Sequence, residues 1–310
     1  MYDTVTLTLP KELVELYDKD SHIQHSIRGP IKKWADKNVE YAGHIKNMAL
    51  TKKFGNLYIT GSLPKYRNGN NIQTIGISDV KFVIDDLSER LCLPLSEAFI
   101  TRIDIGYNLP VKQPAYNYIH RINHVHSYPL MLRYDTNKTF IKTRKALLAY
   151  DKVKEMKVNQ PDYNIEPLGN LLRIELQLDY PHRHLGITSS LKACALYKKP
   201  LARTLIAMWY KECCKVYKNR IPIMPPSITS QKEFSSFLLL MGIKQLGGEN
   251  HLLEFISYLQ LPRSKYPAKI KGDMKRLVET CSSNPRLAIQ DDLDTELDQL
   301  IFRTAFFDSS

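Results

Sequence analysis

Three short segments of the chain each carry two polar residues, two positions apart, inside an otherwise apolar run. The pairs are Arg102 and Asp104 in ITRIDI, Tyr150 and Lys152 in LLAYDK, and Arg173 and Glu175 in LLRIEL. On a β-strand, residues two positions apart point to the same face. The apolar neighbours indicate central strands, where buried charges are costly unless they are paired, hydrogen-bonded or bound to metal. The pattern therefore predicts a polar cleft on one face of a sheet.

The chemistry that fits these residue types is phosphodiester transfer. Tyr150 would attack the phosphorus as a nucleophile and form a covalent phosphotyrosine. Asp104 and Glu175 supply hard oxygen ligands for Mg²⁺ or Mn²⁺, which would polarise the phosphate. Glu155, five residues beyond the tyrosine, could join these metal ligands or act as a base.

The basic members of the three pairs suit the same reaction. Lys152 or Arg102 could lower the pKa of the Tyr150 phenol or neutralise phosphate charge. Arg173 is expected in the same cleft, beside Glu175. The structural alternative is two arginine–carboxylate salt bridges next to a packed tyrosine. A single strand of this kind favours that structural alternative, whereas three of them in one domain of a basic protein favour a functional cleft.

A competing motif is His124-Val125-His126, the His–hydrophobic–His pattern with which HUH endonucleases bind metal. On a strand the two imidazoles would share a face and could bind a divalent cation. The polar surroundings, RINHVHSYP, favour a loop or a helix end instead. Whether His124 and His126 bind metal therefore stays open.

Hydrophobic periodicity changes near residue 182 and predicts an α+β fold. Before this point, strands are expected at 3–9, 38–49, 54–64, 99–108, 129–134, 138–142, 145–151 and 170–178, with helices at 75–92 and 110–122. The Gly, Pro and Asn residues of GSLPKYRNGNN predict a loop over 61–71. After it, only helices are expected, at 187–197, 200–217, 231–246, 250–260 and 268–281.

Charge follows the same division of the chain. The net charge is +12, and residues 183–288 hold most of the excess, whereas the tail DDLDTELDQ is acidic. A strongly basic surface favours nucleic acid as the partner. We therefore expect two domains, a strand-rich catalytic nicking domain at 1–182 and a helical, basic DNA-binding region with a short acidic tail at 183–310.

The densest basic stretch, residues 261–276, could form a helix-turn-helix-like reader with the helices before it. Phosphate contacts would make binding strongly salt-dependent. The residues expected to contact DNA are Lys65, in the 61–71 segment, and Lys265, Lys269, Lys271, Lys275 and Arg276.

Four segments in this order resemble the replication initiators of filamentous phages, the gene II class, and the related Rep proteins of rolling-circle plasmids. They are GSLPKYRNGNN (61–71), ITRIDIGYNL (100–109), TRKALLAYDKVKE (143–155) and LLRIELQLDYPHRHLGI (171–187). Each motif alone is weak, but four in order are fairly specific. These segments cover about residues 55–187. The remainder of the chain resembles the family only in its helical character.

The resemblance implies an HUH-like antiparallel sheet with flanking helices, in which acids replace the metal-binding histidines. It implies that Tyr150 is the nicking nucleophile, that Asp104 and Glu175 bind the divalent metal, and that Glu155 is a third ligand. The protein would nick one strand at a replication origin, stay joined to the 5′ phosphate, and later rejoin the strand. Tyr134, Tyr163 or a second subunit could carry out the closing step, which is the second transfer that recircularises the displaced strand.

Two other functions stay open. One is a non-catalytic, sequence-specific DNA-binding regulator of plasmid or phage replication, and the other is a hydrolytic nuclease in which Tyr150 is structural. The expected partners are the single-stranded nick site, the duplex origin, a possible host helicase and a possible second copy of the chain. No apolar run approaches the roughly 18 residues of a membrane span. Five cysteines without CxxC spacing are typical of free, buried thiols, so we expect a reducing cytoplasm. The resemblance implies that it is the cytoplasm of a bacterial host.

Overall fold

The computed structural model describes residues 1–17, 39–134, 136–160, 163–218, 228–245, 252–254, 266–282 and 293–307. The chain divides into two compact units, which are described separately. Unit 1 consists of Met1–Asn219 with Asp294–Ser310, and unit 2 of Arg220–Leu293.

Unit 1 is built on a nine-stranded antiparallel sheet with the order β2-β3-β4-β1-β5-β10-β9-β8-β7. Its strands are β1 (Tyr2–Leu9), β2 (Val39–Ile45), β3 (Met48–Lys53), β4 (Asn56–Ser62), β5 (Phe99–Pro110), β7 (Leu130–Tyr134), β8 (Asn137–Lys142), β9 (Lys145–Asp151) and β10 (Leu171–Asp179). The three strands with paired polar residues, β5, β10 and β9, are neighbours at its centre. Short β6 (Ile122–Val125) and β11 (Val216–Lys218) form a separate pair.

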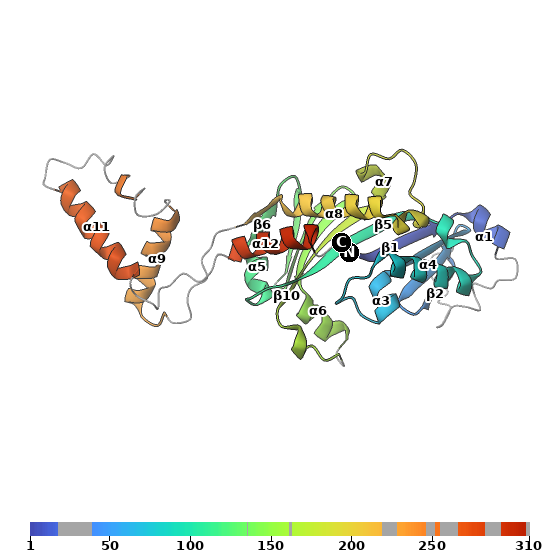
Figure 1. Ribbon diagram of the computed structural model, residues 1–310, viewed down its shortest axis with the longest axis horizontal. Coiled ribbons are helices and arrows are strands. Elements are labelled where there is room, and N and C mark those ends of the chain that lie inside the picture. Colours follow the sequence, from blue (N-terminus) through green and yellow to red (C-terminus); the bar gives the residue numbers. More distant parts are fainter. Residues whose placement is uncertain are drawn as a thin grey trace. The chain divides into compact units, whose positions relative to one another are not determined.

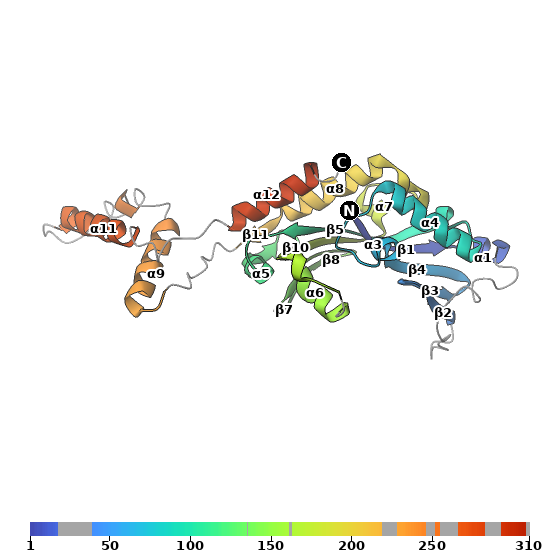
Figure 2. The same ribbon diagram turned by 60° about the horizontal axis from the view of Figure 1, so that its bottom comes forward.

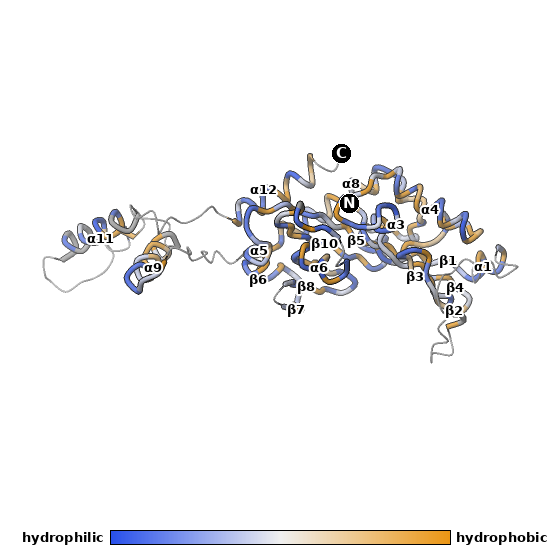
Figure 3. Tube along the Cα trace, turned by 90° about the horizontal axis from the view of Figure 1, so that it is seen from below, coloured by the Kyte–Doolittle hydropathy of each residue, from blue (hydrophilic) through white to orange (hydrophobic). Residues whose placement is uncertain are grey.

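Helices accompany the sheet in unit 1. They are α1 (Lys11–Tyr17), α3 (Leu63–Asn68), α4 (Ile77–Leu91), α5 (Ala115–Arg121), α6 (Lys152–Asn159), α7 (Pro181–His184), α8 (Lys199–Cys213) and α12 (Leu293–Phe306), with short 3-10 turns at Leu95–Glu97, Glu166–Leu168 and Ala193–Tyr197. Figures 1 and 2 show α8, α12 and α4 along one side of the sheet, with α6 on the other. Hydrophobic and hydrophilic stretches alternate along α4, as expected for a helix with one buried side (Figure 3).

Strand alternation separates the two faces of the sheet. The face beneath α8 is apolar and buried. There the Trp209 ring packs against Tyr107 with 4.8 Å between ring centroids, and its indole nitrogen donates a hydrogen bond to the carbonyl oxygen of Ile174 at 3.2 Å. The opposite face carries the polar residues of β5, β9 and β10, and we call it the open face.

The predicted α+β fold, with a large antiparallel sheet, flanking helices and a helical C-terminal region, is confirmed. Kinship of this sheet to HUH enzymes stays a prediction. Compact unit 1 extends beyond the predicted boundary at residue 182, because α8 packs on the sheet and the rings of Tyr210 and Phe306 are 5.0 Å apart, which joins α12 to α8.

Several local predictions were wrong. The expected loop at 61–71 contains helix α3, because Ser62 caps its first turn by accepting from the Lys65 amide at 3.3 Å. Gly69 ends this helix in the left-handed conformation, at φ 78°. The helix expected at 187–197 is an irregular stretch followed by a 3-10 turn at Ala193–Tyr197. Strand β5 runs through Pro110, so α5 begins only at Ala115.

Unit 2 contains α9 (Gln231–Gln245) and α11 (Tyr266–Ser282). Small apolar clusters hold these helices, one around Phe237 and Met241 and another joining Ile243, Leu252 and Val278. Much of the predicted 250–260 helix lies outside the described residues.

Within the described ranges, no helix combines the length and the apolar character that crossing a membrane requires. None of the four cysteines whose side chains the structure describes forms a disulfide, but only Cys213 is buried; Cys92 and Cys214 are exposed. The expectation of buried thiols was therefore wrong for most of them.

Candidate active site

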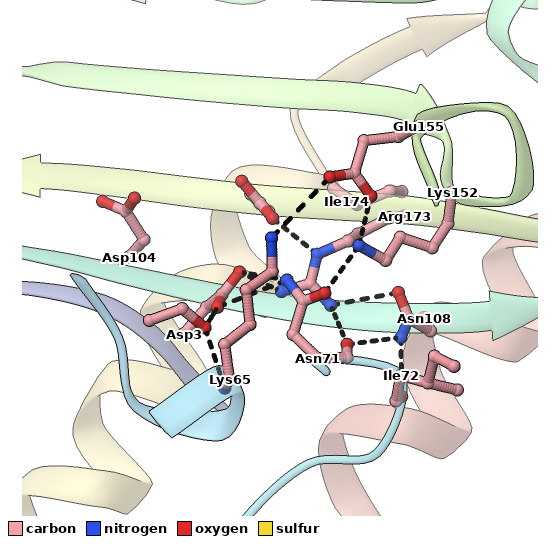
Figure 4. A network of polar contacts seen from close by, with 12 residues as sticks. Asp3, Lys65, Asn71, Ile72, Asp104, Asn108, Lys152, Glu155, Arg173 and Ile174 are labelled. Carbon is pink, nitrogen blue, oxygen red and sulfur yellow. Dashed lines mark hydrogen bonds and ion pairs between the residues drawn. The ribbon is translucent and has the colours of Figure 1, made fainter. Parts of the chain in front are cut away.

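The centre of the open face is organised by Arg173, whose side chain is 3% exposed. Its Nε donates to Glu175 Oε1 at 2.5 Å and its Nη2 to Asp3 Oδ2 at 2.5 Å. Its Nη1 donates to Asn108 Oδ1 at 3.0 Å. Burial alone would lower the pKa of Arg173, but the charges of Glu175 and Asp3 outweigh burial and raise it. Arg173 is therefore a fixed cation between two carboxylates (Figure 4).

Asp3 is a residue of this network that the sequence did not reveal. It accepts a hydrogen bond from Ser62 Oγ at 2.5 Å and from Asn71 Nδ2 at 3.2 Å, besides that from Arg173. Burial would raise the pKa of Asp3, but the charge of Arg173 and these hydrogen bonds lower it. Simple alternation places Asp3 with apolar Val5, whereas the pairing of β1 with β5 shifts register between Tyr2 and Val5.

Tyr150 lies beside Arg173 in the sheet, since the two residues are register partners on β9 and β10. The Tyr150 hydroxyl donates to Glu175 Oε1 at 2.7 Å. Burial, and then the negative charge of Glu175, raise the pKa of Tyr150 well above its usual range, while Arg173 opposes them. At neutral pH the side chain is a phenol with its proton directed at a carboxylate.

Gly106 makes room for this arrangement. It pairs with Glu175 across β5 and β10. A Cβ at this position would come within 2.7 Å of Arg173 Nη2 and 2.8 Å of Glu175 Cγ. Only glycine lets the guanidinium lie across β5 towards Asp3.

We predict that Gly106→Ala displaces Arg173 and Glu175 and destabilises unit 1 by about 1–3 kcal/mol, the usual cost of overpacking. Denaturant unfolding followed by circular dichroism measures this loss. Gly242→Ala in α9 is the matched control, because a Cβ there has no neighbour within 4 Å. Equal unfolding midpoints for Gly106→Ala and the wild type would contradict the prediction.

Arg102 and Asp104 form a second pair on the same face. Arg102 donates to both carboxylate oxygens of Asp104, from Nε at 2.9 Å and from Nη2 at 2.7 Å. Asp104 pairs with Gln177 and Gly106 with Glu175, so Asp104 and Glu175 are diagonal neighbours on adjacent strands. Burial raises the pKa of Asp104 to about 6 although Arg102 opposes it. Figure 4 shows Asp104 to one side of the Arg173 network.

The raised pKa of Asp104 predicts a pH dependence of stability. The folded state binds a proton at Asp104 more tightly than the unfolded chain does, so the free energy of unfolding falls as pH rises from about 4 to about 6. Asp104→Asn lacks this titration. The variant should therefore gain about 1–3 kcal/mol relative to the wild type between pH 4.5 and 7.5. Urea unfolding at both pH values measures the difference in the free energy of unfolding. If the variant instead lost stability relative to the wild type, the ion pair between Asp104 and Arg102 would outweigh the cost of burying the Asp104 charge.

Lys152 lies elsewhere than predicted. It begins α6 instead of continuing β9, because Asp151 caps the helix by accepting from the Lys154 amide at 3.0 Å. The Lys152 side chain is fully buried and donates to Asn71 Oδ1 at 2.7 Å and to Glu155. Burial lowers the pKa of Lys152, despite the opposing charge of Glu155. Lys152 thus ties α6 to the segment after α3.

Glu155 is bound by cations on both sides. Besides Lys152, it forms an ion pair with Lys65 Nζ at 4.0 Å, and Asn159 Nδ2 donates to it at 2.7 Å. Burial would raise the pKa of Glu155, but the hydrogen bond and charge of Lys152 outweigh burial and lower it.

The predicted metal ligands have suitable donor chemistry, since carboxylate oxygens suit Mg²⁺ and Mn²⁺. Their geometry does not fit a three-acid centre, because Asp104, Glu175 and Glu155 each face a different cationic partner. Throughout the described ranges, no three His, Cys, Asp or Glu residues are grouped to hold a metal ion. His124 lies on β6, in the separate two-stranded sheet, and not in the loop or helix end expected.

The structure thus brings Tyr150, Glu175 and Arg173 into direct contact and places Arg102 and Asp104 on the same face. Lys65, Lys152 and Glu155 form an adjoining cluster. In unit 2, Lys269, Lys275 and Arg276 are exposed on α11. Lys265 lies outside the described residues, and so does the side chain of Lys271.

Comparison with protein families matches residues 1–198 to the N-terminal region of the phage replication-associated protein, the gene II product. The match covers most of the chain and all strands of the nine-stranded sheet. The chain belongs to this replication-associated protein family. Its membership confirms the predicted resemblance to filamentous-phage gene II initiators and supports a role in phage replication. A comparison with curated proteins gave no match.

Proposed function

We propose that this member of the gene II family initiates replication by nicking one strand of DNA with Tyr150 and later rejoins the strand. The observation that carries the proposal is the 2.7 Å hydrogen bond from the Tyr150 hydroxyl to Glu175 on the open face of the sheet. A nucleophile needs a base within hydrogen-bonding distance, and here the base is itself held by Arg173.

Because its pKa is raised, Tyr150 would react as a phenol that loses its proton during the attack. The proton passes to Glu175 while the bond from the tyrosine oxygen to phosphorus forms. The bond from phosphorus to the leaving 3′ oxygen breaks, and solvent protonates this oxygen. The result is a 5′ phosphotyrosine and a free 3′ hydroxyl. In rejoining, a 3′ hydroxyl gives its proton to solvent and attacks the phosphotyrosine. The bond from phosphorus to the tyrosine oxygen breaks, and this oxygen recovers the proton from Glu175.

Arg173 would contribute by orienting Glu175. The short contact from Nε to Glu175 Oε1, at 2.5 Å, uses the same oxygen that accepts from Tyr150. As the reaction puts the proton on Glu175, the attraction between Arg173 and Glu175 weakens. Asp3 remains as the second counterion of the buried guanidinium.

A divalent cation, Mg²⁺ or Mn²⁺, is a separate part of the proposal. When bound, it would supply positive charge to the scissile phosphate. The cation takes part in no step described above, because the three predicted acids each contact a different cationic side chain. Isothermal titration calorimetry with MnCl₂ tests whether the protein binds the cation. A nicking assay in EDTA tests whether the reaction requires it. Binding that Asp104→Asn and Glu175→Gln both weaken would support a metal at these residues, and full nicking in EDTA would exclude a requirement.

The remaining expectations concern partners. We propose that the basic surface of α11, with Lys269, Lys275 and Arg276, binds the duplex origin, and that the protein acts in the bacterial cytoplasm. Recruitment of a host helicase and formation of a homodimer for the closing step also stay proposals.

One assay separates the three functions. A single-stranded origin oligonucleotide is incubated with protein and Mg²⁺ or Mn²⁺, then separated on a denaturing protein gel. A covalent adduct supports transfer to tyrosine. Cleavage without an adduct indicates a hydrolytic nuclease, and binding without cleavage leaves the regulator.

A further inference from the structure

A groove of about 640 Å³ opens directly beside Tyr150, between α6 and strands β8 and β9. This volume is within the usual range of small-ligand sites. On the sheet side it is lined by Asn137, Thr139, Leu148 and Tyr150, and on the helix side by residues of α6.

The sheet side of the groove is continuous with the candidate active site. Asn137 is the register partner of Tyr150, and Thr139 that of Leu148, so all four side chains belong to the open face. A molecule in the groove therefore lies against the strand that carries the proposed nucleophile.

The helix side adds charge and an apolar contact. Lys154 and Lys157 are exposed and stand three positions apart on α6, which puts them on one side of the helix. Among the described residues neither forms an ion pair, whereas nearby Lys152 and Lys65 share Glu155. Val158, next to Lys157, is 80% exposed at the same groove.

We propose that this groove holds the unstacked nucleotide next to the scissile phosphate of single-stranded DNA. Leu148 and Val158 would contact the faces of the base, and the amide of Asn137 and the hydroxyl of Thr139 would reach its edge. Lys154 and Lys157 would bind the flanking phosphates. A base in a duplex cannot enter such a groove without leaving its stack. The inference rests on the proposed function, and it assigns part of the choice of nicking position to Asn137 and Thr139.

The lysine contacts are tested with the full chain and a fluorescent single-stranded oligonucleotide of random sequence. For single strands, the slope of log affinity against log salt changes by about 0.7 for each phosphate neutralised. The double variant Lys154→Ala/Lys157→Ala should therefore lower the steepness of this slope by about 1.4. Lys199→Ala/Lys211→Ala, which removes two exposed lysines of α8 on the other face, is the matched control and should leave the slope unchanged.

Base reading is tested by sequencing the nicks made in a random-sequence pool. We expect a base preference at one position beside the nick, and Asn137→Ala should reduce that preference about tenfold. A reduced slope in the double lysine variant, with no tyrosine adduct in the wild type, would keep the groove as a DNA contact and refute nicking by Tyr150. Normal adduct formation with an unchanged slope and unchanged base preference would overturn the groove and leave the proposed function standing.

Discussion

Tyr150→Phe is expected to abolish the covalent protein–DNA adduct, with a loss of about 10³-fold or more in the rate of nicking. The variant loses only the hydroxyl that donates to Glu175 at 2.7 Å. The ring, which lines the groove, is retained, so affinity for single-stranded DNA should change by less than about threefold. Adduct formation on denaturing gels and anisotropy with the same oligonucleotide measure the two effects.

Tyr134→Phe and Tyr163→Phe are the controls for this result. Both tyrosines are exposed, and neither is part of the Arg173 network. First-strand nicking should survive in each variant, whereas rejoining would fail in the one that serves the closing step. An adduct that persists in Tyr150→Phe and disappears in either control would transfer the nucleophile to that residue.

Arg173→Ala is expected to be the most destabilising single change in the site. It leaves the carboxylates of Asp3 and Glu175 buried without their shared cation. Removing one partner of a buried ion pair typically costs about 3–5 kcal/mol, because the remaining charge is uncompensated. Urea unfolding at pH 7, followed by circular dichroism, measures the change in free energy of unfolding.

Arg67→Ala is the matched comparison. Arg67 also binds an aspartate, Asp79, at 3.1 Å, but this pair is exposed and worth no more than about 1 kcal/mol. If both variants lost the same small amount of stability, the buried network would not hold the sheet together. Arg173→Lys separates charge from geometry, since lysine keeps the charge but cannot bind Asp3, Glu175 and Asn108 at once.

The sequence was sufficient to locate the central strands and the face that carries the site. Alternation in ITRIDI and LLRIEL placed Arg102 with Asp104 and Arg173 with Glu175, and both pairs form in the structure. Apolar runs with short turns also identified the antiparallel meander of β7, β8 and β9, because these contacts are local.

Other parts of the site depend on features that alternation does not describe. Lys152 leaves the strand because Asp151 is a helix cap, a signal in the sequence that competes with strand alternation. The Ser62 cap and Pro64 at the start of α3 are a second signal of this kind. Asp3 and Asn71 could not be assigned, since their roles depend on a register shift and on a pairing between distant segments.

The ion pair between Arg173 and Asp3 joins residues 170 positions apart in the chain. Closing so long a loop costs chain entropy, and contacts between distant residues slow folding. Asn71, which bonds both Asp3 and Lys152, also accepts a hydrogen bond from Arg173 at its carbonyl oxygen. During synthesis, Tyr150 is added to the chain before Arg173 and Glu175, the residues that orient it. A partly made or partly folded chain therefore has the tyrosine but lacks its proposed base, so the proposed nicking would require the assembled sheet.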